Sequence, residues 1–160
     1  MDPHGTPYTH DPVDLHFMQI AIDQAKQSIP VEKAYCVGAV LVKNNTALTT
    51  GYSRELPGNT HAEECALAKL MHMEDAKDAT MYTTMEPCSI RLSGNRPCTD
   101  RIIEANISRV VLGVREPPNL VQCAGIQLLE QHGIQIAIVP GVKEACLAPN
   151  QHILKEIPDK

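Results

Sequence analysis

Residues 83–98 read TTMEPCSIRLSGNRPC and residues 60–63 read THAE, and these two stretches decide what the chain folds into. They supply one imidazole, His61, and two thiols, Cys88 and Cys98, each cysteine preceded by a proline. One histidine and two cysteines can hold a zinc ion and leave a fourth position open, whereas structural zinc sites are usually closed by four protein ligands. The pattern therefore predicts a zinc (Zn2+) centre of the catalytic kind.

Glu63 follows the histidine by two residues and is the expected proton carrier of this centre. Zinc lowers the pKa of a bound water to roughly 7. A carboxylate beside that water can take its proton, protonate a ring nitrogen and later protonate a leaving amine. A His-x-Glu followed by Pro-Cys pairs resembles the zinc-dependent deaminases, in which the glutamate is not a zinc ligand. We therefore expect Glu63 to be the catalytic acid and base.

Each part of the pattern also has a plainer interpretation. Thr60 and Glu63 have the spacing of a helix capping box. Cys88 and Cys98 could be ordinary buried thiols, or they could form a disulfide with each other. The conjunction of the parts favours a zinc deaminase, and the alternative from another class is a zinc-binding domain without turnover. Glu63 argues against that alternative, because folding does not require a proton carrier.

The spacing of the two cysteines narrows the resemblance. Deaminases in general carry Pro-Cys-x-x-Cys, whereas nine residues separate Cys88 from Cys98 in this chain. A Thr-x-Glu-Pro-Cys-Ser run, a glycine-containing loop and a second Pro-Cys resemble the riboflavin-pathway pyrimidine deaminases, and the Arg-Leu-Ser-Gly-Asn loop is similar to that of the fungal type. The resemblance extends from about Asp14 to Val142. It implies an α/β chain with the cytidine-deaminase fold, a three-layer α/β/α architecture around a mixed five-stranded sheet.

The same resemblance implies a substrate and its contacts. The implied reaction belongs to riboflavin biosynthesis and converts 2,5-diamino-6-ribitylamino-4(3H)-pyrimidinone 5′-phosphate to 5-amino-6-ribitylamino-2,4(1H,3H)-pyrimidinedione 5′-phosphate plus ammonia. Thr84 and Glu86 are the implied ring contacts, and the plainer interpretation of Glu86 is a structural hydrogen bond. A phosphate needs cationic or backbone donors, and the candidates are Arg91, Arg96 and Arg54, which could also be solvated. The choice of a ribityl over a ribosyl sugar rests on the loop between the cysteines.

One position departs from the pattern of the wider superfamily. Many members have Asn-Pro-x-Val-Gly before the first strand, with the asparagine touching the ring, whereas residues 34–38 read AYCVG here. Ala34 cannot make that contact, so either Tyr35 or another group replaces it, or the ring is held differently. This disfavours a free nucleoside or base as the substrate. A zinc deaminase acting on another nucleobase, nucleotide or tRNA base remains the rival.

Size and charge limit the partners. With 160 residues the chain is expected to form one deaminase domain over 12–157, after a flexible tail over 1–11. A net charge of −5 and the lack of a Lys/Arg cluster disfavour a nucleic-acid partner. Neither a membrane span of roughly 20 apolar residues nor an apolar signal core is present. We expect a cytoplasmic enzyme with a small phosphorylated pyrimidine as its partner, and the resemblance implies a homodimer.

Hydrophobic patterning orders the elements. The first helix begins at Asp11-Pro12, ends before Pro30 and is expected to bury Leu15, Met18, Ile22 and Ala25. A hairpin and then alternating strands and helices follow, which indicates a mixed sheet covered on both faces. The expected strands are 37–42, 47–52, 79–85, 109–114 and 134–138; the expected later helices begin at 61 and span 99–105, 120–131 and 142–157. The cysteines expected to be packing residues are Cys36, Cys65, Cys123 and Cys146.

Overall fold

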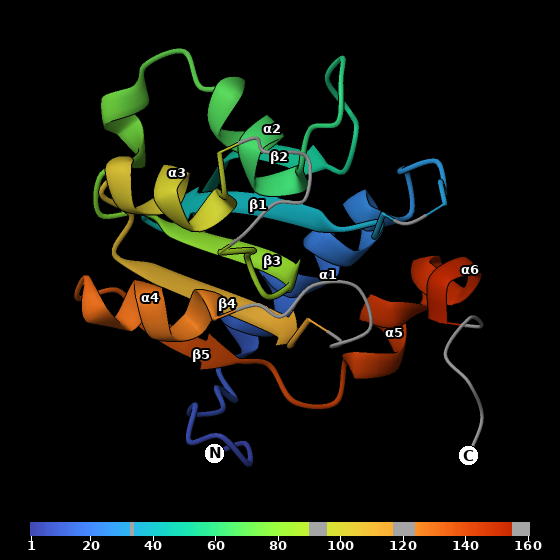
Figure 1. Ribbon diagram of the computed structural model, residues 1–160. Coiled ribbons are helices and arrows are strands. Elements are labelled where there is room, and N and C mark those ends of the chain that lie inside the picture. The colour runs from blue at the N-terminus through green and yellow to red at the C-terminus, as the bar shows by residue number, and fades with distance from the viewer. Residues whose placement is uncertain (33, 90–95, 117–123, 155–160) are drawn as a thin grey trace.

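A five-stranded sheet with helices on both faces forms the molecule, as the computed structural model shows for residues 1–32, 34–89, 96–116 and 124–154 (Figure 1). The strands are β1 (Gly38–Lys43), β2 (Thr46–Tyr52), β3 (Thr80–Met85), β4 (Arg109–Val114) and β5 (Gln135–Ile138). The helices are α1 (Pro12–Ala25), α2 (Ala62–Ala68), η1 (Met73–Ala76), α3 (Cys98–Glu104), α4 (Gly125–Gln131), α5 (Lys143–Leu147), η2 (Ala148–Asn150) and α6 (Gln151–Leu154). The mixed α/β/α architecture expected from the sequence is thereby confirmed.

The strand order β2-β1-β3-β4-β5 places the carboxyl ends of β3 and β4 beside each other. Strand β1 is antiparallel to both of its neighbours, β2 and β3, whereas β3, β4 and β5 are parallel. In open α/β sheets, ligands bind beyond the carboxyl ends of the parallel strands. Residues that follow β3 therefore lie at the edge where a site is expected.

Two apolar cores separate the helices into layers. Side chains of α2, α3 and α4 pack on one face of the sheet, around Leu41, Met81 and Leu112. Side chains of α1 and α5 pack on the other face, around Val40 and Val111. Neighbouring strand residues thus serve opposite layers, as the period-two geometry of a strand requires.

A glycine lets α2 lie close to the sheet. A Cβ atom on Gly51 of β2 would come within 2.2 Å of the carbonyl oxygen of Ala62, the first residue of α2. Any larger residue would force the helix away from the strand. This contact fixes the end of α2 that carries His61 and Glu63.

The last predicted helix is interrupted. Residues 143–154 form α5, a 3₁₀ turn and α6 in place of one helix over 142–157, and residues 155–157 lie outside the described part of the chain. Pro149 sits in the 3₁₀ turn, and a proline removes one backbone donor and obstructs the preceding turn of an α-helix. The sequence prediction gave this proline too little weight.

The N-terminal segment also differs from the flexible tail that its composition predicted. The Ile138 backbone N–H donates to the Pro7 carbonyl and the Thr9 N–H donates to the Ile138 carbonyl, each over 2.9 Å, so the segment runs beside β5. Nearer the N-terminus, Asp2 is buried and forms an ion pair with Arg115, whose Nε lies 2.5 Å from Asp2 Oδ2. Composition describes only local preferences, and it carries no information on a partner that is distant in sequence.

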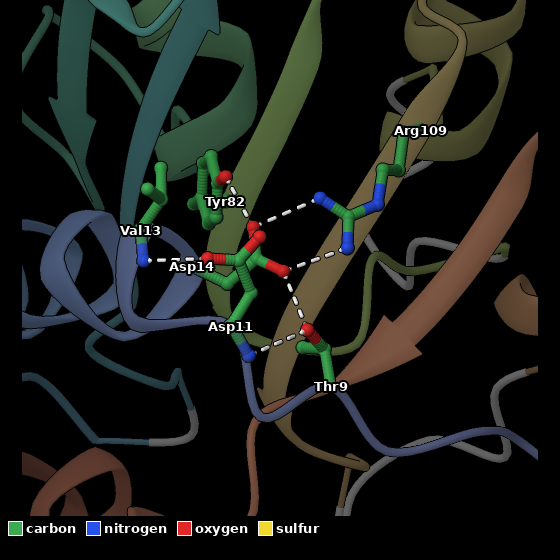
Figure 2. Close-up of polar contacts among 6 residues, drawn as sticks. All are labelled: Thr9, Asp11, Val13, Asp14, Tyr82 and Arg109. Carbon is green, nitrogen blue, oxygen red and sulfur yellow. Dashed lines mark hydrogen bonds and ion pairs between the residues drawn. The ribbon is translucent and has the colours of Figure 1, made fainter.

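A buried ion pair anchors α1 to the sheet (Figure 2). Asp14 was not expected in the core, yet it is 2% exposed, while Leu15, which was expected there, is 43% exposed. Both carboxylate oxygens of Asp14 accept from the Arg109 guanidinium, over 2.8 and 2.7 Å. Tyr82 and Thr9 donate a further hydrogen bond each, over 2.6 Å. The helix face is therefore turned toward a polar partner that helical periodicity alone does not reveal.

Burial disfavours the ionised form of Asp14, but the hydrogen bonds from Arg109, Thr9 and Tyr82 outweigh it and lower the pKa of this carboxyl to about 2. Burial, followed by the hydrogen bond to Asp14, raises the pKa of Tyr82. Asp14 is therefore ionised at neutral pH and acts as a fixed anchor. No helix in the described part of the chain is both long and apolar enough to cross a membrane.

Candidate active site

Three elements bring His61, Cys88 and Cys98 together at the carboxyl end of β3. His61 precedes α2 as its N-cap, Cys88 follows β3 by three residues, and Cys98 begins α3. The Nδ1 atom of His61 lies 3.6 Å from Cys88 Sγ and 3.4 Å from Cys98 Sγ. All three candidate ligand atoms lie within 4.8 Å of one another.

These distances fit a zinc ion. Zinc bonds of about 2.3 Å to sulfur and about 2.0 Å to nitrogen in a tetrahedron would place the N and S atoms roughly 3.5 Å apart. The two observed N–S distances, 3.6 and 3.4 Å, lie on either side of that value. Both cysteines are free thiols, so the alternative of a disulfide between them is not realised. The donor set of one imidazole and two thiols is the set that zinc prefers.

Cys88 and α3 hold each other in place. The backbone N–H of Cys98 donates to Cys88 Sγ over 3.5 Å, and the N–H of Thr99 donates to the Cys88 carbonyl over 3.2 Å. These are two of the donors that a helix leaves unpaired at its start. Hydrogen bonding from the Cys98 side chain, followed by the contribution of His61, lowers the pKa of Cys88 well below its usual range. The site therefore favours the thiolate, which is the form that binds metal.

Glu63 lies in the first turn of α2 and is 4% exposed. Burial raises its pKa to about 7, although the neighbouring His61 acts in the opposite direction. Among the ion pairs of the described residues, none includes Glu63. A carboxyl group that is buried beside three metal-ligand candidates without a cationic partner is suited to exchange protons.

Thr83 is the partner of Glu63 that the sequence prediction missed. Its Oγ1 atom lies 3.3 Å from Glu63 Oε2 and 3.0 Å from the Met85 carbonyl oxygen. A threonine hydroxyl has one proton and can also accept, so a protonated Glu63 can donate to Thr83 while Thr83 donates to Met85. Strand alternation could have indicated this residue, because Thr83 shares a sheet face with Met81 rather than with Thr84.

The capping box exists one residue away from where its spacing was first placed. Glu64, not Glu63, accepts the hydrogen bond from the N–H of the N-cap residue, which is His61 rather than Thr60; the distance is 3.2 Å. The two adjacent glutamates therefore have different roles. Glu64 closes the helix end, and Glu63 is left beside the metal-ligand candidates.

Thr84 and Glu86 are held by the backbone. Thr84 is fully buried and its hydroxyl accepts from the Gly38 N–H over 3.1 Å, which ties β3 to β1. Glu86 is 7% exposed, and its carboxylate accepts from the N–H of Glu116 over 3.3 Å and from the N–H groups of Ile126 and Gly125. Burial nevertheless raises the pKa of Glu86. These contacts give both residues a structural role, and the ring contacts implied by the resemblance stay a prediction.

The arginines considered for the phosphate are occupied or lie outside the described residues. Arg54 donates to Ser28 Oγ over 3.0 Å and to backbone carbonyls, including that of Tyr35 over 3.3 Å. Arg96 is exposed and forms an ion pair with Glu104 on α3. Arg91 falls in 90–95, outside the described part of the chain. A phosphate would have to compete with a partner for Arg54 or Arg96.

The family model for the cytidine and deoxycytidylate deaminase zinc-binding region matches residues 12–114, which include all three ligand candidates and Glu63. The chain belongs to this family. The matched family region is a zinc-binding region, and this chain has a His–Cys–Cys cluster within it. A zinc site therefore fits both the family and the geometry.

Relatives with similar sequences carry riboflavin-pathway names. The chain is 46% identical over 144 residues to the diaminohydroxyphosphoribosylamino-pyrimidine deaminase of Schizosaccharomyces pombe, which covers 88% of this chain and 35% of that protein. It is 37% identical over 131 residues to the riboflavin biosynthesis protein RibD of Aquifex aeolicus, covering 79% and 35%. The chain thus spans about a third of the length of these curated relatives.

Solved structures agree with the fold. Acinetobacter baumannii RibD superimposes with a TM-score of 0.78 at 33% identity, over 89% of this chain and 39% of that one. The Aspergillus oryzae Rib2 deaminase in complex with DARIPP superimposes with a TM-score of 0.75 at 31% identity, over 86% of this chain and 89% of that one. The cytidine-deaminase-like fold implied by the sequence resemblance is confirmed.

Proposed function

We propose that the chain catalyses the hydrolytic deamination of a phosphorylated diaminopyrimidinone in riboflavin biosynthesis. The observation that carries this proposal is the His61–Cys88–Cys98 cluster with the buried Glu63 beside it, which forms no ion pair with any residue that the structure describes. The riboflavin-pathway names of relatives up to 46% identical support the substrate class. A zinc-binding domain without turnover would give no reason to bury a carboxylate without a cation.

His61, Cys88 and Cys98 are the residues that would hold zinc. When bound, the ion supplies Lewis acidity that makes water a nucleophile at neutral pH. Cys88 and Cys98 enter the ligand set as thiolates, a state that the hydrogen bonds between Cys88 and the start of α3 already favour. The first turns of α2 and α3 fix the positions of the three ligand atoms, so little rearrangement accompanies binding.

Glu63 carries the protons in the proposed reaction. It takes one from the attacking water and gives it to the ring nitrogen next to the amino-bearing carbon. It then takes the remaining proton from the added hydroxyl group and passes it to the amine, so that the C–N bond breaks, ammonia leaves and the carbonyl forms. Thr83 follows these changes, because its hydroxyl can donate to the carboxylate form and accept from the protonated form. Burial of Glu63 keeps bulk water from replacing it in this exchange.

The proposed substrate is 2,5-diamino-6-ribitylamino-4(3H)-pyrimidinone 5′-phosphate, with the ribosyl compound as the rival. The ribityl choice is supported by the fungal-type loop between Cys88 and Cys98, whereas the name of the Schizosaccharomyces pombe relative specifies a phosphoribosyl compound. A homodimer is proposed on the family resemblance, and sedimentation of the purified protein at several concentrations measures it.

A direct turnover assay tests the function. Ribityl and ribosyl diaminopyrimidinone phosphates are compared as substrates, with cytidine and deoxycytidylate as controls, by ammonia release and product mass. We expect turnover of the ribityl compound and much less of the ribosyl one. Turnover of cytidine or deoxycytidylate alone would retain the zinc chemistry and discard the substrate. Inactivity toward all four, in protein shown to hold zinc, would overturn the proposal.

A further inference from the structure

We propose that Glu64 is a positioning residue for the metal site, which it serves by joining the two helix starts that carry His61 and Cys98. This inference rests on the proposed zinc function of those residues. Glu64 is the third residue of α2, next to Glu63 in the chain. Its two carboxylate oxygens reach two different elements, and both contacts end next to a candidate ligand.

The first contact fixes the residue that carries the imidazole. Glu64 Oε1 accepts from the backbone N–H of His61 over 3.2 Å. His61 is the N-cap of α2 and has extended backbone angles, φ −92° and ψ 162°. Its N–H would otherwise have no helical partner. The bond therefore restrains the backbone from which the imidazole side chain projects.

The second contact reaches α3. Glu64 Oε2 lies 3.2 Å from Nη2 of Arg101, and the two side chains are 18% and 29% exposed. Arg101 is the fourth residue of α3, and its N–H closes the first turn of the helix by donating to the Pro97 carbonyl over 3.4 Å. Cys98 is the first residue of that same turn. One carboxylate thus links the backbone of one ligand residue to the turn that bears another.

The linkage matters because His61 and Cys98 come from separate helices. Their ligand atoms, Nδ1 and Sγ, are 3.4 Å apart, and a relative shift of the two helix starts would alter that distance directly. Mutating a residue that hydrogen-bonds to a metal ligand and orients it commonly lowers metal affinity or activity by about 10- to 100-fold. The Glu64 side chain is only 18% exposed, so dissolved salt screens its ion pair less than it screens a surface pair.

Three variants separate the two contacts. Glu64→Gln keeps an oxygen that can accept from His61 and loses the charge toward Arg101. Arg101→Met removes the ion pair and leaves the bond to His61, and Glu64→Ala removes both. The matched control is Glu55→Gln, because Glu55 also pairs with a lysine of similar exposure, Lys69, at the far end of α2 over 2.7 Å.

The experiment measures zinc affinity by competition with a chelator and the absorption spectrum of the protein loaded with Co²⁺. We expect Glu64→Ala to weaken zinc binding about 10- to 100-fold, with smaller losses in Glu64→Gln and Arg101→Met. The cobalt bands should shift in all three and stay unchanged in Glu55→Gln. At saturating zinc, kcat should fall while KM stays constant, because Glu64 does not contact substrate.

Equal zinc affinities and cobalt spectra in Glu64→Gln, Arg101→Met and Glu55→Gln would overturn the inference while leaving the proposed function intact. The wild-type protein serves as the separate check on that function. If it failed to bind zinc, both proposals would fall together. Unfolding midpoints in urea accompany each variant, so that a loss of affinity from a loss of fold is recognised.

Discussion

Two buried carboxylates on opposite faces of the sheet behave in opposite ways. Asp14 on α1 and Glu63 on α2 are 2% and 4% exposed, and both reach the same strand, β3. Tyr82 donates to Asp14, and the next residue, Thr83, donates to Glu63 from the other face. The pKa of Asp14 is lowered to about 2, whereas burial raises that of Glu63 to about 7.

The difference lies in the partners rather than in burial. Asp14 is matched by a guanidinium that contacts both of its oxygens, and Arg109 holds it ionised at all ordinary pH values. Glu63 has a hydroxyl partner and stands beside thiols and an imidazole. A carboxylate paired with a cation anchors structure, and a buried carboxylate with a neutral hydroxyl partner remains able to change its protonation state.

The largest expected effect comes from Glu63→Gln. General acid–base groups contribute about 10²- to 10⁴-fold to a rate, so we expect a loss of that size in kcat. The free energy of unfolding should not fall, because the variant removes a buried charge that has no cationic partner. Ammonia release and urea unfolding check both parts. If Glu63→Gln lowered the unfolding free energy as much as an Asp14 variant is expected to, the two carboxylates would not differ in their structural role.

Asp14→Asn should act in the reverse manner. Losing one member of a buried pair costs about 3–5 kcal/mol, and because Arg109 is 28% exposed we expect about 2–4 kcal/mol in urea unfolding. Turnover of the folded fraction should stay within about twofold of wild type, since Asp14 lies on the face away from the ligand cluster. The double variant Asp14→Asn/Arg109→Met should recover part of the lost unfolding free energy, because it also removes the guanidinium that Asp14→Asn leaves unpaired. If nothing is recovered, the unpaired guanidinium is not the cause of the loss.

Acid should weaken the same anchor. The pKa of Asp14 in the folded protein, about 2, lies below its ordinary value of 3.8, so its stabilisation is complete above about pH 4 and disappears as the pH falls to about 2. The difference corresponds to about 2 kcal/mol. Unfolding free energies of wild type and Asp14→Asn should therefore converge by roughly that amount over this range. Parallel curves between pH 4 and pH 2 would contradict the assignment.

A surface ion pair gives the smallest effect and calibrates the others. Asp23 and Lys26 on the exposed side of α1 lie 3.9 Å apart with side chains 72% and 63% exposed. Exposed pairs contribute about 0–1 kcal/mol, so Asp23→Asn should change the unfolding free energy by less than about 0.5 kcal/mol. If Asp23→Asn lowered the unfolding free energy as much as Asp14→Asn does, the loss in both variants would come from a change in the helix rather than from the burial of the Asp14 pair.

The sequence predicted correctly those features that depend on a motif or a run of apolar residues. His61, Cys88 and Cys98 were grouped from their spacing, and the structure brings their ligand atoms together. The strands were also predicted closely, and β4 (Arg109–Val114) has the bounds expected of it. Apolar runs between turns leave little freedom in such assignments.

The prediction failed where a side chain meets a distant partner. The Asp14–Arg109 pair and the Asp2–Arg115 pair join positions far apart in the chain. Local patterning gives no reason to bury Asp14, because it registers polarity and not the cation that will pair with it. The same limit hid Thr83, whose role depends on Glu63 reaching β3 from another helix.

The most direct test of the contrast is turnover per bound zinc, measured for Glu63→Gln and Asp14→Asn side by side at a temperature where both are folded. We expect full zinc content in both, a loss of about 10²-fold or more in Glu63→Gln, and near wild-type turnover in Asp14→Asn. Undiminished turnover in zinc-loaded Glu63→Gln, or an equal loss in the two variants, would contradict this expectation.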